Sequence, residues 1–190
     1  MLNTAAVSAA FPPDAADPDA SNDTAQAGFT VKAVVIAPRL AKGEVRDSLA
    51  ALPPSGDRHT DKSILRAIEE IDKSLDPIRW IDDSTLDPDK GLQVFDREAK
   101  AVRELIKVVD KSGPLAGDAQ TAVDTLVEID RRLAQLAIDA AVAGGGDPKD
   151  INKANENMAK ALSEFDKGHF DHAIKNYRNA WKDARNALRP

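Results

Sequence analysis

The sequence predicts an all-α protein: an antiparallel bundle of about five helices over residues 40–190. Apolar residues recur there at spacings of three and four, which is the period of an amphipathic helix. The connections between these stretches are short and rich in Gly, Pro and Asp, and short connections favour antiparallel neighbours. The chain is 42% hydrophobic but only 4% aromatic. Its core is therefore expected to consist of Ala, Leu, Ile and Val, as in closely packed helices.

Two segments are predicted to precede the bundle. Residues 1–28 contain four Asp and no Lys or Arg, and they show no hydrophobic period. We interpret them as a disordered acidic leader or an inter-domain linker. Residues 29–39 are apolar and β-branched as far as Pro38, which predicts a short extended segment. No partner strand follows it in the sequence.

The first helical stretches are bounded by prolines. Residues 41–52 carry apolar residues at spacings of four and three and stop at Pro53. The next stretch is expected to begin at a cap formed by Thr60 or Asp61 and to end at Pro77. Its predicted inward face includes Ile64 and Leu65.

Glycines separate the remaining stretches. One runs roughly from residue 91 to 111, and the longest ends at the glycine run 144–146. The following stretch begins with Asp147 as a cap and Pro148 at the first helical position, which is a strong start signal. The last stretch runs from about residue 170 to 188 after Gly168.

The aromatic residues are predicted to close the core. On the last stretch they recur at spacings of three and four, which places them on one side of a helix. The alternative is a ligand groove lined by these rings. The predicted structural core residues are Phe165, Phe170, Ile174, Tyr177, Trp181, Trp80 and Phe95.

An acidic connector is the candidate metal site. Asp82, Asp83, Asp87 and Asp89 lie within eight positions, and clustered carboxylate oxygens suit Ca²⁺. The spacing does not fit an EF-hand loop. A simpler interpretation is that these residues cap helices and form Asx turns.

Two histidines near the end of the chain raise a second metal hypothesis. His169 and His172 are three positions apart, with Asp166 and Asp171 nearby. Imidazoles with carboxylates suit Zn²⁺ or Cu²⁺. Because no third histidine is close in sequence, the favoured interpretation is a pair of polar surface residues.

Several function classes are disfavoured. The absence of Cys excludes disulfides, thiolate catalysis and zinc–sulfur sites. Four of the six net negative charges come from residues 1–28, so the rest is nearly balanced and offers no basic face for nucleic acid or anionic lipid. No apolar run approaches the ~20 residues that a membrane span needs. No catalytic motif occurs, so an enzyme is not expected. Carboxylates such as Glu98 and Glu104 are expected to lie on solvated helix faces.

Four phrases of the sequence carry a resemblance to a known module. They are SGD-T-D at 55–61, SLDP-W-DD-LD at 74–87, VFD-E-KAV-EL at 94–105 and DHAI-Y--AW at 171–181. Residues 45–188 thereby resemble a helical module of unknown function at the C-terminal end of large secreted prokaryotic multidomain proteins.

The resemblance implies an extracellular or cell-surface location and a non-catalytic structural or protein-interaction role, with other protein domains as partners. It carries no active site to transfer. The alternative function is a calcium-binding or metal-responsive domain that uses the loop from Asp82 to Asp89. The sequence as given shows no signal peptide, which would favour the cytoplasm if the chain is complete.

Overall fold

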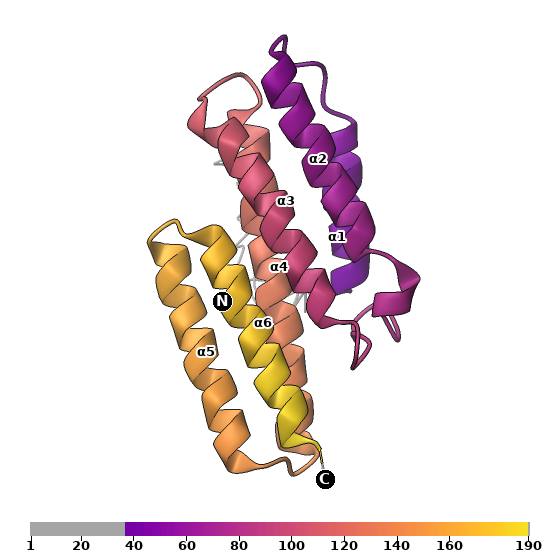
Figure 1. Ribbon diagram of the computed structural model, residues 1–190, viewed down its shortest axis with the longest axis vertical. Helices are drawn as coiled ribbons and strands as arrows, with labels where there is room; N and C mark the ends of the chain where they lie inside the picture. The colour runs from indigo at the N-terminus through magenta and orange to yellow at the C-terminus, as the bar shows by residue number, and fades with distance from the viewer. Residues whose placement is uncertain (1–36, 190) are drawn as a thin grey trace, which may run out of the picture. The chain divides into compact units, whose positions relative to one another are not determined.

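The computed structural model describes residues 37–189, and within them the chain folds as six α-helices and one short 3₁₀ turn (Figure 1). No strand occurs among these residues, so the all-α class is confirmed. The elements are α1 (Pro38–Ala50), α2 (Arg58–Ser74), η1 (Pro77–Arg79), α3 (Leu92–Asp110), α4 (Ala116–Ala143), α5 (Pro148–Asp166) and α6 (Phe170–Ala187).

Two expectations about the helices are wrong. The bundle has six helices rather than about five, and the predicted helical stretch before Pro53 is one of them and buries Val45 and Leu49. This helix begins at Pro38, so the last two residues of the extended segment predicted over 29–39 are helical. Proline suits the first helical position, because its φ is already helical and its missing N–H would have no partner there. Residues 1–36 lie outside the described range, and so do the predicted leader and most of the extended segment.

The helices pack mainly with their neighbours in sequence, and α6 adds contacts that close the bundle. Helices α1, α2, α3 and α4 pack in consecutive pairs, α1 also packs on α4, and α5 pairs with α6. Helix α6 packs on both α3 and α4. Figure 1 shows α3 and α4 between the α1–α2 pair and the α5–α6 pair.

Local sequence signals fix the ends of the helices. The Asp57 side chain accepts hydrogen bonds from the backbone N–H groups of His59 and Thr60. The cap of α2 is therefore Asp57 rather than the predicted Thr60 or Asp61, and the helix starts at Arg58. At the start of α5, the Asp147 side chain accepts a hydrogen bond from the Lys149 N–H. Gly168 has a φ of +76°, a left-handed conformation that lets the chain reverse between α5 and α6.

The core contains the predicted aromatic residues at different depths. Phe95 and Trp181 are buried with ring centroids 6.2 Å apart, and Ile174, Tyr177 and Trp80 are buried with them. Phe165 and Phe170 are half-buried and meet edge to face at 5.4 Å.

Leu65 was predicted to face inward but does not. Leu65 is 66% exposed, whereas its neighbour Ile64 is 6% exposed. Consecutive residues are about 100° apart around a helix, so Leu65 can lie outside a buried stripe that includes Ile64. The buried stripe of α2 follows Ile64, Ala67 and Ile71 instead.

Candidate functional site

Two of the four carboxylates of the predicted calcium site accept backbone hydrogen bonds within the connector between α2 and α3. Asp82 accepts a hydrogen bond from the Ser84 N–H at 2.7 Å, and Asp87 accepts from the Asp89 and Lys90 N–H groups. Asp83 pairs with Arg39 of α1 at 3.7 Å. Among the described residues, this loop brings no three ligand atoms within 4.8 Å of one another. Calcium binding by the loop stays a prediction.

Four helices each contribute one polar side chain to a cluster inside the core. These side chains are Lys42 of α1, Ser74 of α2, Glu98 of α3 and Asp130 of α4, and each residue is 0% exposed. The Lys42 Nζ lies 2.7 Å from Asp130 Oδ1 and 3.5 Å from Glu98 Oε1. The Ser74 hydroxyl lies within hydrogen-bond distance of both Glu98 Oε1 and the Ile71 carbonyl. We call this set the buried charge cluster.

The buried charge cluster holds one more carboxyl group than ammonium group. Burial raises the pKa of Asp130 to about 7, although the nearby Lys42 ammonium opposes this. The pKa of Lys42 itself is raised, because attraction by Asp130 and Glu98 outweighs the loss of solvation. Binding of one proton by the cluster near neutral pH leaves its net charge close to zero, the state that a low-dielectric interior favours.

The expectation for Glu98 is therefore wrong. It was expected on a solvated helix face because of the basic residues nearby in sequence, but it lies in the core in phase with Val94 and Val102. Within the described residues, Glu98 Oε2 and Asp130 Oδ2 have no hydrogen-bond partner. Every member of the cluster is closed to solvent, and the contacts within it join four helices.

A groove runs between one face of α1 and the start of α4. It encloses about 460 Å³. Lys42 of α1 meets Asp130 of α4, whereas later residues of α1 lie beside earlier residues of α4, so the two helices run antiparallel. The groove is lined by Ala41, Glu44, Val45, Ser48 and Leu49 of α1, by Leu52 just after that helix, and by Asp118, Thr121, Ala122 and Thr125 of α4.

The groove combines an apolar floor with an acidic rim. Val45, Leu49 and Ala122 are buried at its base. Glu44 and Asp118 are exposed, and within residues 37–189 neither forms a salt bridge. We call this feature the α1–α4 groove. It presents uncompensated negative charge beside apolar surface.

The structure also joins the two histidines of the sequence hypothesis to a carboxylate. Glu164 of α5, His169 at the start of α6 and His172 each offer a ligand atom, and these atoms lie within 4.8 Å of one another. Sequence reasoning placed Asp166 and Asp171 near the histidines and missed Glu164. The signal was the glycine reversal at Gly168, which folds the end of α5 back beside the start of α6.

The chain matches no family model, no curated protein and no solved structure with which it was compared. None of the helices between residues 37 and 189 is both long and apolar enough to cross a bilayer.

Proposed function

We propose that the helical region is a non-catalytic protein-interaction module that binds an amphipathic helix of a partner protein in the α1–α4 groove. The observation that carries this proposal is the apolar floor of the groove between two exposed carboxylates without salt-bridge partners, Glu44 and Asp118. The resemblance to the helical module of secreted proteins supports a non-catalytic role. The extracellular location that it implies stays a prediction.

The dimensions of the α1–α4 groove select the kind of partner. Its α1 side extends from Ala41 to Leu52, which corresponds to roughly three helical turns or about 16 Å. A helix of that length with apolar residues at positions i, i+3, i+4 and i+7 presents a matching stripe. Lys or Arg beside that stripe would face Glu44 and Asp118 and give the complex its charge complementarity.

A designed peptide tests this proposal directly. The probe is a fluorescein-labelled amphipathic helix of about 14 residues with a leucine stripe flanked by lysines, titrated with the full chain by fluorescence anisotropy. The control peptide keeps the leucines and replaces the lysines with glutamates. We expect the lysine peptide to bind at least about ten-fold more tightly at low salt, a difference of about 1.4 kcal/mol, and the difference to shrink as salt is added.

Two matched variants locate the binding. Ser48→Trp places a large ring in the groove, whereas Ala50→Trp places it on an exposed position of α1 that does not line the groove. We expect at least about ten-fold weaker binding for Ser48→Trp and unchanged binding for Ala50→Trp. Equal effects, or a preference for the glutamate peptide, would contradict the proposal. Self-association that only Ser48→Trp abolishes would identify a second copy as the occupant and overturn the partner-helix assignment.

A further inference from the structure

The α5–α6 turn holds a donor set that is separate from the α1–α4 groove. His169 Nδ1 lies 2.9 Å from Glu164 Oε2, and His172 Nδ1 lies 3.8 Å from the same oxygen. The two imidazole ring centroids are 5.8 Å apart. Donors that bind one metal ion at about 2.0–2.2 Å in a tetrahedral arrangement lie roughly 3.3–3.6 Å from one another. The two separations from Glu164 Oε2, 2.9 Å and 3.8 Å, bracket that range.

The backbone holds these donors in place before any ligand binds. The His169 N–H donates to the Glu164 carbonyl at 2.9 Å, and the Gly168 N–H donates to the Phe165 carbonyl at 2.9 Å. The edge-to-face contact of Phe165 with Phe170 packs the two helix ends together. Small side-chain rotations therefore suffice to bring three donors onto one ion.

We propose that Glu164, His169 and His172 bind a divalent transition-metal ion, with Zn²⁺ suited to this set of two imidazoles and one carboxylate. The histidine side chains are 57% and 58% exposed, so an ion reaches them from solvent and keeps water in its remaining coordination positions. Hard cations such as Ca²⁺ prefer all-oxygen sites. Cu²⁺ binds the same nitrogen donors more tightly than Zn²⁺.

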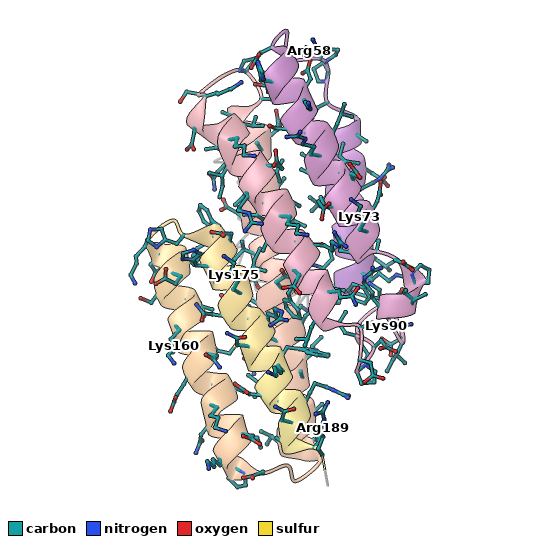
Figure 2. The ribbon with its side chains drawn as sticks, in the orientation of Figure 1. Arg58, Lys73, Lys90, Lys160, Lys175 and Arg189 are labelled. Carbon is teal, nitrogen blue, oxygen red and sulfur yellow. The ribbon has the colours of Figure 1, made fainter. Side chains whose placement is uncertain are left out.

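Neighbouring charges set the strength of this site. Lys167 contacts Glu164 Oε1 at 2.8 Å and leaves Oε2 to the histidines. Asp171 Oδ1 lies 4.0 Å from His172 Nε2, which is beyond hydrogen-bond distance, so it adds negative charge beside the site without fixing the ring. Lys160 and Lys175, labelled on α5 and α6 in Figure 2, line a shallow depression together with Glu164 and His172. The positive charge of Lys167 opposes the binding of a cation, so its removal is expected to strengthen binding.

Isothermal titration of the full chain with ZnCl₂ tests the proposal. We expect one ion per chain and at least about ten-fold weaker binding for His169→Ala and for His172→Ala. His59→Ala, which removes an exposed histidine from α2, is the matched control and is expected to bind as the wild type does. Lys167→Met is expected to bind Zn²⁺ more tightly. Circular dichroism checks that each variant is folded, and the affected side chains are all at the surface.

Several outcomes would overturn the assignment. One is binding that survives the loss of both His169 and His172, which would place the ion elsewhere. Another is an equal loss in His59→Ala, which would indicate non-specific binding to imidazoles. Nuclear magnetic resonance gives an independent readout: Zn²⁺ should shift the ring signals of His169 and His172 and leave those of His59 in place.

Discussion

Replacement of Lys42 by Met is expected to be among the most damaging single substitutions in the described residues. The lysine is 0% exposed and lies 2.7 Å from Asp130 and 3.5 Å from Glu98. Methionine fills a similar volume, so the change removes the charge and leaves the packing nearly intact. What remains is a pair of buried carboxyl groups with no cation beside them.

The size of the effect follows from the geometry. At an effective dielectric constant of about 20, an ion pair with charges ~4 Å apart contributes about 4 kcal/mol. Breaking a buried ion pair by removing one partner costs about 3–5 kcal/mol. We therefore expect Lys42→Met to lose about 4 kcal/mol of unfolding free energy near neutral pH, a large part of the ~5–15 kcal/mol that holds a typical domain together.

Urea unfolding followed by circular dichroism measures this loss. Lys100→Met makes the same charge change at an exposed position of α3 and is expected to stay within about 0.5 kcal/mol of the wild type. Adding Glu98→Gln and Asp130→Asn to Lys42→Met removes the unpaired charges and should restore most of the stability. A loss below about 1 kcal/mol for Lys42→Met alone would refute the reasoning, because it would mean that water solvates the cluster.

Three further predictions concern other parts of the structure. Because the folded-state pKa of Asp130 is raised from 3.8 to about 7, the stability that it contributes is fully present below the unfolded value and is lost as pH rises through about 7. Relative to Asp130→Asn, the wild type should therefore lose stability between about pH 4 and pH 8 in equilibrium unfolding measurements. Gly168→Ala should lower the free energy of unfolding by about 1 kcal/mol, because the φ of Gly168 is +76°, although nothing would contact the added Cβ. Gly117 lies within α4 with equally open space around it. Gly117→Ala should therefore raise the melting temperature slightly. Trp181→Ala should cost about 3–5 kcal/mol in the same urea assay, because the ring is buried against Phe95.

Helix positions and most of the core could be predicted from the sequence because they depend on local signals. A proline or an aspartate cap acts within a few residues, as at Asp147 and Pro148 before α5. The hydrophobic period identifies a buried face but not its centre. Leu65 was assigned to that face together with Ile64, yet only contacts with other helices decide how much of each side chain is covered.

The buried charge cluster was not predicted because charged residues were assigned to the surface by their charge. Their positions relative to the apolar stripe of each helix point to the core instead. Glu98 lies four residues after Val94 and four before Val102, and Lys42 lies three before Val45 and seven before Leu49. These spacings place both charged residues on apolar stripes. The contact between the two side chains could not be predicted from the sequence, because it depends on how α1 and α3 pack with α4.

For a related reason, only the two histidines of the Glu164–His169–His172 group could be predicted from the sequence. The histidine pair is visible within one helix turn, whereas Glu164 joins it only through the reversal at Gly168. A glycine between two helical stretches predicts that the chain turns, but the residues that meet depend on the geometry of the turn.

The buried charge cluster and the α1–α4 groove are connected through α1. This helix has 13 residues, a length that is only marginally stable by itself in water. Lys42 joins it to the core, and its side that faces the start of α4 forms one wall of the groove. Loss of Lys42 should therefore release α1 more readily than it unfolds the other helices.

Hydrogen exchange of Lys42→Met separates a local role of the cluster from a global one. If Lys42 is the main contact that holds α1, amide protection should fall most in α1. In α3 and α6, protection should fall only as far as the lower global stability requires. The lysine-flanked peptide should then bind more weakly to Lys42→Met under conditions where circular dichroism shows the chain still folded. A uniform loss of protection in all six helices would show instead that the cluster stabilises the whole bundle as one cooperative unit, and that the groove persists as long as the fold does.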